Sequence, residues 1–292
     1  MTDFKTMTNG LSQSPEGIWH KQGRERGNVS YPTDGNENVF QVEDHSFWFR
    51  HRNQVIENLV NEYSPGELIF DIGGGNGCVT KWLQDKGIEA VLLEPGSDGV
   101  RNAANRGVEQ IIHSTFEESD FDDGAIPAAG MFDVLEHIEK DKEALSMLYQ
   151  KIQPGGRLFL TVPAFGALWS VEDDHAGHFR RYSLGQLREI LEQSGFEVEY
   201  ASYLFSFLII PIWIFRSLPS HLGFRRNVKL ETARKEHSSG RGFINKLVNR
   251  LLKWELKKIR RKETILLGSS CLVVAKKVCS IESKFKSDSD IN

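Results

Sequence analysis

The side chains in this sequence that are best suited to chemistry gather in two short segments. Residues 133–137 end in an adjacent glutamate and histidine, and residues 169–182 contain two histidines, two arginines, two aspartates and a tyrosine. Histidine titrates near neutral pH, so it can take a proton from an attacking oxygen or nitrogen. We therefore predict that His137, His178 and His175 are the catalytic residues.

Structural interpretations compete with these roles. The acid and histidine at 136–137 could fix a loop through hydrogen bonds, and the 169–182 segment could be a salt-bridged connection. An exposed connection needs none of these residue types in particular, whereas arginine forks suit a phosphate or carboxylate on an acceptor. We favour an acceptor-facing role for this segment and predict that Arg181 and Tyr182 contact the acceptor.

A third cluster, at residues 44–53, is both aromatic and basic. It could line a lid over the site, or it could be part core and part solvated helix face. We predict that Trp48 and Arg52 contact the acceptor. No metal-binding spacing such as H-E-x-x-H links the histidines, so we predict no metal site.

A glycine-rich loop at residues 68–77, with the sequence LIFDIGGGNG, lies between a short apolar run and a predicted helix. Glycines there let the backbone turn tightly and approach a ligand closely. An acid, Glu94, ends the next predicted strand and can accept hydrogen bonds from both hydroxyls of a ribose. The dinucleotide pattern G-x-G-x-x-G fails because its third glycine would be Cys78, whereas D-x-G-x-G-x-G is complete.

The elements that must position these residues alternate between strand and helix, which predicts an α/β fold with a mostly parallel sheet and helices on both faces. The apolar runs predict strands at 68–70, 88–93, 108–112, 129–132, 157–163, 196–203 and 264–275. Amphipathic patterns and end signals predict helices between them, including 78–86, 98–106, 141–152 and 184–194. A helical pattern also covers residues 40–62, ahead of the first strand.

The complete glycine pattern resembles motif I of the class I S-adenosylmethionine (SAM) dependent methyltransferases. Residues 132–138 (FDVLEHI) and 153–163 (QPGGRLFLTVP) are similar to later motifs of the type 11/12 methyltransferases, and the resemblance covers about 40–203 plus the last strand. It implies a Rossmann-like seven-stranded sheet, an N-terminal helical lid and SAM as cofactor. The residues it places at the cofactor are Asp71, Gly73, Gly74, Gly75, Gly77, Glu94, Phe132 and Asp133, and we add Phe116 as a candidate for the adenine edge.

The same resemblance leaves one further role open for the 133–137 segment. Ubiquinone-biosynthesis O-methyltransferases are similar here, and some of them hold a divalent metal with acid and histidine residues of this segment. By that analogy Asp133, Glu136 and His137 could do the same. Fixing the loop through hydrogen bonds is the other interpretation of Glu136 and His137.

Charge is distributed unevenly along the chain. The 292 residues carry a net charge of −4, but residues 221–262 hold fourteen Lys and Arg against three Glu, a net charge of +11. The rest of the chain therefore carries −15. An apolar run at 204–215 precedes this stretch, and together they predict a helical insert, residues 204–262, between the last two strands. The insert could contact an anionic membrane, pack on the protein or a second copy, or bind nucleic acid, which we regard as unlikely.

The domain organisation follows from these segments. We predict a flexible arm at 1–38, a SAM-binding domain at 39–203 plus 263–278, the insert, and a disordered tail at 279–292. Three scattered cysteines and a polar N-terminus favour a cytoplasmic location, with membrane association through the insert. The predicted function is SAM-dependent methylation, most simply O-methylation, of a small-molecule or lipid-linked acceptor. The alternatives are a non-catalytic SAM-binding adaptor, or a methyltransferase that acts on RNA or protein.

Overall fold

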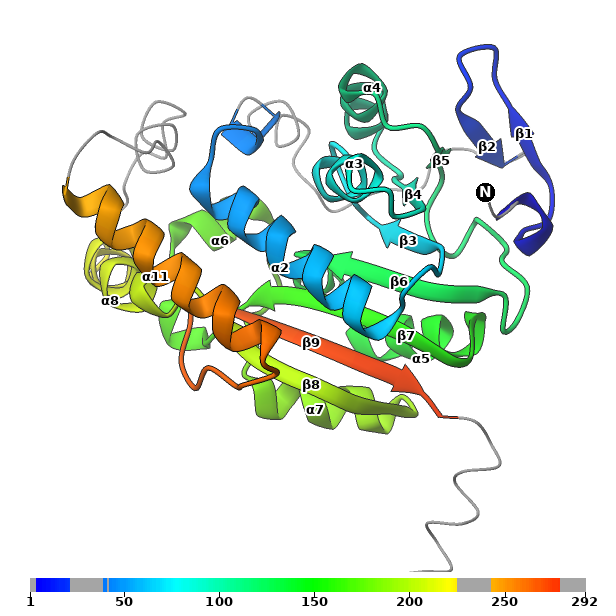
Figure 1. Cartoon of the computed structure of the whole chain (residues 1–292). Helices are drawn as coiled ribbons and strands as arrows, with labels where there is room; N and C mark the ends of the chain where they lie inside the picture. The colour runs from blue at the N-terminus through cyan, green and yellow to red at the C-terminus, as the bar shows by residue number, and fades with distance from the viewer. Residues whose placement is uncertain (1–3, 22–38, 41, 225–242, 279–292) are drawn as a thin grey trace, which may run out of the picture.

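One mixed sheet organises the chain, which the computed structural model describes over residues 4–21, 39–40, 42–224 and 243–278 (Figure 1). The strand order across the sheet is β1-β2-β5-β4-β3-β6-β7-β9-β8. Every pairing from β2 to β7 is parallel, whereas β9 is antiparallel to both of its neighbours, β7 and β8. The strands are β1 (Leu11–Gln13), β2 (Trp19–Lys21), β3 (Ile69–Ile72), β4 (Ala90–Leu93), β5 (Ile111–His113), β6 (Ile126–Phe132), β7 (Ile152–Pro163), β8 (Phe196–Leu204) and β9 (Ser270–Lys277).

Alternating side chains of the central strands fill two separate cores, one on each face of the sheet. In β7, Leu158 and Leu160 enter one core, and Phe159 between them enters the other. All of these side chains are essentially inaccessible to solvent. The predicted α/β fold with a mostly parallel sheet is therefore confirmed.

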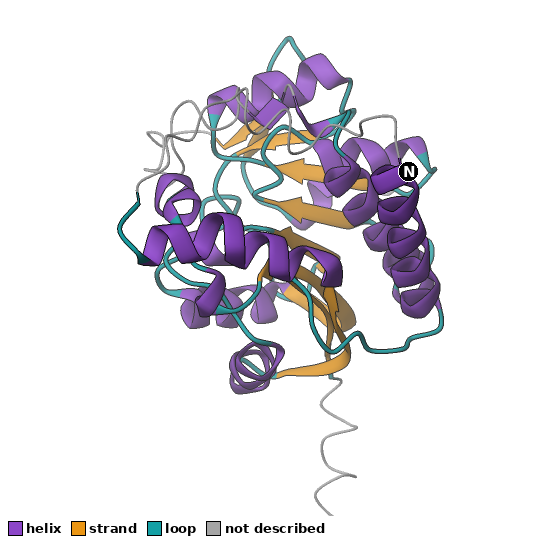
Figure 2. Ribbon diagram, turned by 90° about the vertical axis from the view of Figure 1, so that its left-hand side faces the viewer, coloured by secondary structure: helices purple, strands orange, loops and turns teal. Residues whose placement is uncertain are grey.

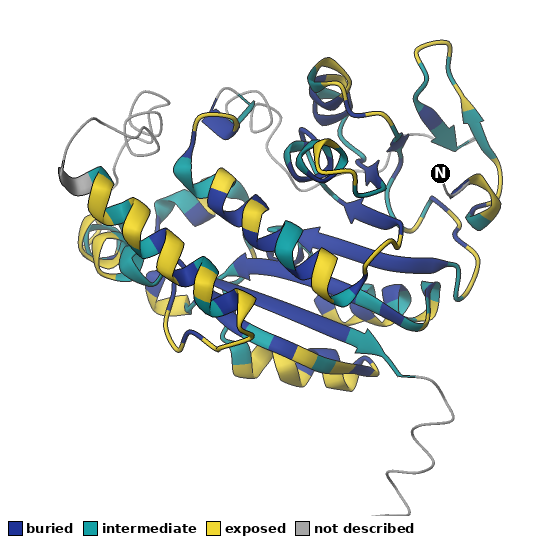
Figure 3. Cartoon of the chain, in the orientation of Figure 1, coloured by how far each residue is buried: buried dark blue, intermediate teal, exposed yellow. Residues whose placement is uncertain are grey.

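Helices cover both faces of this sheet, as Figure 2 shows. One core takes its helical residues from α2, α3 and α11, and the opposite core takes them from α5 and α7. Figure 3 shows the central strands of the sheet as buried and the outward faces of α2, α7 and α11 as exposed. The helices are α2 (Phe47–Tyr63), α3 (Cys78–Asp85), α4 (Ser97–Arg106), α5 (Asp141–Lys151), α6 (Val171–Ala176), α7 (Leu184–Gln193), α8 (Ile209–Ile212), α9 (Leu218–His221) and α11 (Phe243–Arg260), with a 3-10 turn, η2 (Leu135–His137), after β6.

The sheet has nine strands in place of the predicted seven, because part of the expected flexible arm is ordered. Strands β1 and β2 form a hairpin that extends the sheet beyond β5. Trp19 is only 9% exposed and packs edge-on against Phe4, at a ring separation of 5.8 Å. This aromatic anchor outweighs the polar composition of the segment. The rest of the predicted arm, 22–38, lies outside the described residues.

The predicted insert is helical where it is described, at α8, α9 and α11. Its central part, 225–242, and the predicted tail at 279–292 lie outside the described residues. The last strand begins at Ser270, later than predicted, because residues 264–269 run along the end of β8 and contact it. Within the described ranges, no helix has both the length and the apolar character that crossing a membrane requires.

Candidate active site

The glycine loop forms the turn between β3 and α3. Gly73, Gly75 and Gly77 all have positive φ angles, between 55° and 69°, which favour glycine over other residues. Gly74 is required for a different reason: a Cβ atom there would lie 2.5 Å from Oδ2 of Asp71. The loop backbone is therefore held close to the sheet, and the amides of Gly73 and Gly77 are bound by the carbonyls of Leu93 and Gly74.

Two buried acids organise this loop. Asp71 is completely buried and accepts a hydrogen bond of 2.6 Å from Oγ1 of Thr80, and burial raises the pKa of Asp71 to about 6. Glu94, at the end of β4, accepts hydrogen bonds from the amides of Gly75 (2.9 Å) and Gly96 (2.7 Å). Burial raises the pKa of Glu94 to about 7, even though both backbone hydrogen bonds favour its ionised form.

A cavity of about 730 Å³ opens beside the loop, at the carboxyl ends of the parallel strands. Ligands bind at this edge in open α/β sheets. The predicted site residues that line it are Trp48, Arg52, Gly73, Gly74, Gly75, Glu94, Phe116, Phe132, Asp133, His137 and His178. Asp71, Gly77, His175, Arg181 and Tyr182 are not among its lining residues.

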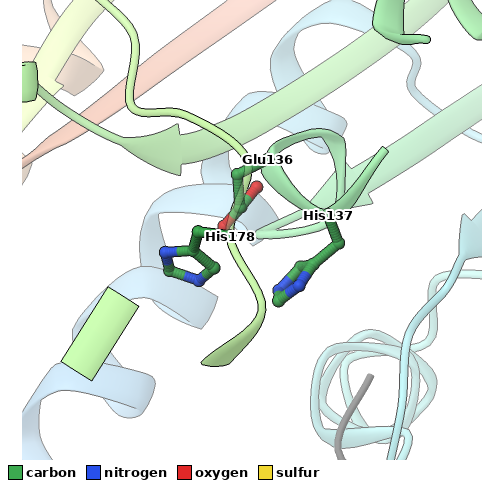
Figure 4. A group of neighbouring side chains, drawn as sticks. All are labelled: Glu136, His137 and His178. Atoms are coloured by element: carbon green, nitrogen blue, oxygen red, sulfur yellow. The ribbon is translucent and has the colours of Figure 1, made fainter. Parts of the chain in front are cut away.

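Three side chains converge on one wall of the cavity (Figure 4). Glu136 and His137 come from η2, and His178 comes from the connection between α6 and α7, so that their ligand atoms lie within 4.8 Å of one another. The two imidazole rings meet edge to face, with centroids 4.7 Å apart. We refer to these three residues as the acid–histidine cluster.

The electrostatics of this cluster follow from its burial. Burial and the nearby Asp133 raise the pKa of Glu136 well above its usual range. Burial and the neighbouring His178 lower the pKa of His137 to about 4, so His137 is neutral at physiological pH. This wall of the cavity therefore carries the neutral imidazole of His137 and the carboxyl group of Glu136.

A buried carboxylate behind the cluster fixes the ring of His178. Asp173, only 1% exposed, accepts a hydrogen bond of 2.8 Å from Nδ1 of His178. Both of its oxygens are also bound by the guanidinium fork of Arg181, at 2.8 and 3.0 Å. Although burial opposes ionisation, these hydrogen bonds hold the pKa of Asp173 below its usual value. Nε2 of His178 is the ring nitrogen left for a ligand.

This arrangement corrects three predicted roles. Arg181 does not line the cavity, because its guanidinium is occupied by Asp173. Tyr182 is 3% exposed and donates a hydrogen bond of 2.9 Å to Asp141, so it secures the start of α5. His175 is exposed on α6 and lies away from the lining. Within the charged segment, Asp173 and Arg181 position His178, whereas Arg180 pairs with Asp141 and Asp174 accepts a hydrogen bond from Trp169.

The predicted lid contacts the cavity through α2. Arg52 pairs with Asp133, which follows β6 with a φ of 59°, and its guanidinium also lies 4.9 Å from the ring of Trp48. Arg52 is 6% exposed, so this pair is largely removed from water. Arg52 thus holds the lid to the sheet and has less freedom to bind an acceptor than predicted.

One contact between the lid helix and the insert was not predicted from the sequence. His51 of α2 lies 3.3 Å from Glu255 of α11, and both are buried. Glu255 also accepts hydrogen bonds from the amides of Phe205 and Ser206. The basic insert is therefore anchored directly to the lid helix. No local pattern relates residues 51 and 255, which are distant in sequence.

Comparison with known proteins agrees with this geometry. A family model described as a methyltransferase domain matches residues 48–201, more than half of the chain, and the chain therefore belongs to this family. A probable SAM-dependent methyltransferase of Mycolicibacterium smegmatis is 23% identical over 171 residues, which cover 58% of this chain and 66% of that protein. SAM is accordingly the cofactor that the glycine loop and Glu94 fit.

Other curated relatives match shorter parts. A ubiquinone/menaquinone biosynthesis C-methyltransferase of Vibrio vulnificus is 27% identical over 39% of this chain and 49% of its own length. A ubiquinone biosynthesis O-methyltransferase of Cronobacter sakazakii is 22% identical over 33% of this chain and 42% of that protein. The chain thus spans between 42% and 66% of the length of these three curated relatives. The relatives therefore include enzymes that methylate different kinds of atom.

Solved structures show the same fold. Phosphoethanolamine N-methyltransferase 2 of Haemonchus contortus, in complex with SAM, superposes with a TM-score of 0.54 at 16% identity, over 86% of this chain and 58% of that one. A possible histamine N-methyltransferase of Thermotoga maritima gives a TM-score of 0.52 at 19% identity, over 85% of this chain and 99% of that one. These likenesses establish the Rossmann-like methyltransferase fold.

Proposed function

We propose that this protein is a SAM-dependent methyltransferase that methylates an oxygen of a small-molecule or lipid-linked acceptor. The observation that carries the proposal is the shared cavity: the motif I glycines and Glu94 form one part of its lining, and the acid–histidine cluster forms another. A bound SAM supplies an activated methyl group. The protein must then hold an acceptor in line with that group and keep water out.

The acid–histidine cluster supplies what an oxygen acceptor needs in addition. As the new carbon–oxygen bond forms, the sulfur–methyl bond breaks, its electron pair stays on sulfur, and the hydroxyl proton must leave. Nε2 of His178 can accept that proton, because Asp173 holds the other ring nitrogen and stabilises the resulting cation. A general base of this kind contributes about 10²–10⁴-fold to the rate.

Cofactor binding is tested by calorimetric titration of SAM into the full chain. The wild type should bind, and Gly75→Arg should not, because the new side chain would fill the cavity beside the loop. Gly66→Arg is the matched control: Gly66 also has a positive φ, of 75°, but lies at an exposed turn with open space around it. Absence of binding to the wild type contradicts the enzyme assignment.

The acceptor class is tested by turnover. Methyl-labelled SAM and the full chain are incubated with a cell extract, which is then separated into lipid, small-molecule, RNA and protein fractions. Label in the lipid or small-molecule fraction supports the proposal. If the labelled product is a methyl ether, the methylated atom is oxygen. Label confined to RNA or protein assigns the acceptor class differently. SAM binding without transfer in any fraction supports an adaptor.

An exposed apolar patch on the insert supports delivery of the acceptor from an anionic membrane surface. Ile210, Trp213, Ile214 and Phe215, on adjoining helical turns, are 42–69% exposed. On α11 two exposed apolar residues, Leu247 and Trp254, lie among exposed basic ones: Lys246, Arg250, Lys253, Lys257 and Arg260. The two segments meet where the side chain of Glu255 accepts the amide hydrogen of Ser206, at 2.7 Å. Apolar side chains beside basic ones are typical of interfacial helices.

Vesicle sedimentation tests this delivery. Vesicles with anionic phosphatidylglycerol should bind the protein at low salt, and binding should fall at high salt. Ile210→Ser with Phe215→Ser should weaken binding, as should Lys253→Glu. Lys86→Glu, at the residue that follows α3, is the charge-matched control and should bind like the wild type. Salt-independent association, or concentration-dependent dimerisation that the double variant abolishes, would instead assign the patch to contact with the protein itself.

A further inference from the structure

The acid–histidine cluster has the composition of a metal site as well as that of a base. It offers two imidazole nitrogens and one carboxylate oxygen, and these donors come from two separate segments that meet only in the fold. Two histidines with one carboxylate suit a first-row divalent ion such as Zn²⁺, Fe²⁺ or Co²⁺ and leave positions open for another ligand. Mg²⁺ and Ca²⁺ prefer oxygen donors.

Glu136 provides a second and independent observation. It is 1% exposed, and its Oε2 atom has no hydrogen-bond partner among the residues that the structure describes. A buried carboxylate oxygen without a partner is costly, because it has lost its water and gained nothing in return. Figure 4 shows this carboxylate facing the two imidazole rings. A cation between them would satisfy it.

His178 is held as metal-bound histidines commonly are. In such sites the ring nitrogen away from the metal usually donates to a carboxylate, which fixes the tautomer and the ring orientation. Here Nδ1 of His178 lies 2.8 Å from Asp173, and Arg181 holds Asp173 from the other side. Nε2 is thereby directed away from Asp173, on the side of the cavity.

The spacing of the donors is close to what an ion needs. Their ligand atoms lie within 4.8 Å of one another, whereas two ligands of a tetrahedral Zn²⁺ with bonds of about 2.1 Å lie roughly 3.4 Å apart. Side-chain rotations would have to shorten the longest of these separations by about 1.4 Å to bring the donors to one ion. Asp133, the other acid nearby, is already paired with Arg52 and is not a member of the cluster.

We propose that Glu136, His137 and His178 bind a divalent transition-metal ion, with Asp173 as the residue that orients His178. The ion would lie in the part of the cavity that the cluster lines, the acceptor half, as opposed to the cofactor half lined by the glycine loop and Glu94. The open positions would take the acceptor oxygen. With an ion bound, coordination would lower the pKa of the acceptor hydroxyl, and its proton would pass to solvent. His178 would then be a ligand, and its role as a base belongs to the protein without the ion. The role of the ion rests on the proposed function, whereas its binding can be measured separately.

Metal binding is tested on the full chain, free of any histidine tag and stripped with chelator. Co²⁺ is added, and its visible absorption is recorded alongside calorimetric titration with Zn²⁺ and with Mg²⁺ as a comparison. We expect one Co²⁺ or Zn²⁺ per chain, with absorption bands of an imidazole-bound ion, and much weaker binding of Mg²⁺. His178→Ala and Glu136→Gln should lose the stoichiometric site. His175→Ala, which removes an exposed histidine of the same segment, should retain it.

Two further measurements distinguish failure of the metal site from failure of the proposed function. Asp173→Asn should weaken Co²⁺ binding by about 10–100-fold, because it removes the carboxylate that orients His178. Thermal melting and SAM titration on each variant show whether the fold and the cofactor half are intact. Stoichiometric binding that survives His178→Ala, or no binding by the wild type, overturns the metal site even if SAM binds. Failure of SAM binding alone overturns the proposed function and leaves the metal result standing.

Discussion

The two halves of the cavity are built in different ways. The cofactor half uses backbone groups of one short loop, held in place by glycine conformations and by Asp71 and Glu94. The acceptor half uses side chains from α2, η2 and the α6–α7 connection, which are held by side-chain pairs such as Asp173 with Arg181. Substitutions within the glycine loop should therefore disturb the cofactor half directly. The acceptor half depends in addition on residues outside the cavity that hold its side chains in place.

This difference has a chemical counterpart. SAM is the cofactor in this half, and the residues that fit it are the glycine loop and Glu94. Acceptors differ among the relatives and structural neighbours, which include C-, O- and N-methyltransferases. Under the proposed function, the acceptor half carries the groups that decide which atom is methylated, and changes in each half should have separable effects on SAM binding and on turnover.

The largest effect is expected from Gly74→Val in the cofactor half. Its Cβ would lie 2.5 Å from Asp71 and 2.6 Å from Leu92, neither of which can move far within the buried sheet. Overpacking of this kind costs about 1–3 kcal/mol and would displace the loop. We expect SAM affinity to fall by about a hundredfold or more, measured by calorimetry. Gly185→Val, where the nearest atom lies 3.9 Å away, is the control and should leave SAM affinity unchanged.

In the acceptor half, His178→Ala should reduce kcat by about a hundredfold, in line with the loss of a group that assists proton removal. SAM affinity should stay within about twofold of the wild type, because none of the contacts of His178 reaches the glycine loop. Single-turnover kinetics with saturating SAM measure the effect. An equal fall in kcat for His175→Ala would contradict the assignment of the proton-removing role to His178.

Glu94 gives an intermediate effect that depends on pH. Ribose hydroxyls bind the ionised carboxylate better, so SAM binding should lower the pKa of Glu94 from about 7. Affinity should then rise with pH up to about 7 and level off above it, and fall up to about tenfold for each pH unit below. Glu94→Gln should bind SAM about tenfold more weakly at pH 8 and lose this dependence. A pH dependence that persists in Glu94→Gln would assign it to another group.

Much of the cofactor half could be predicted from the sequence because it is local. The glycines and Asp71 lie within seven residues, and their spacing reflects one turn between a strand and a helix. The strand predicted at 129–132 is shorter than β6, which begins at Ile126, and this difference has a physical cause as well. The small residues of β6 match the crowding around Gly130, where a Cβ would lie 2.3 Å from the ring of Phe132, so that bulky apolar residues do not fit.

The sequence predicts where the acceptor half lies, but it does not predict which of its side chains face the cavity. The charged segment at 169–182 was correctly placed near the cavity, yet sequence cannot tell which charges face a ligand and which face one another. Arg181 and His178 are three residues apart, and only the fold directs one to the back of Asp173 and the other to the cavity. The same limit applies to His51 and Glu255, whose pairing depends on the packing of α2 against α11.

The smallest effect is expected from Tyr182→Phe, and it distinguishes a supporting residue from one that contacts the acceptor. The hydroxyl of Tyr182 donates to Asp141, which also pairs with Arg180 at 2.7 Å and therefore keeps a partner after the substitution. Loss of one such hydrogen bond costs about 1 kcal/mol, measured as a small decrease in the free energy of unfolding. SAM affinity, kcat and KM for the acceptor should all match the wild type. A raised KM would return Tyr182 to the acceptor half, because a buried supporting hydroxyl has no means of changing acceptor affinity while the fold is intact.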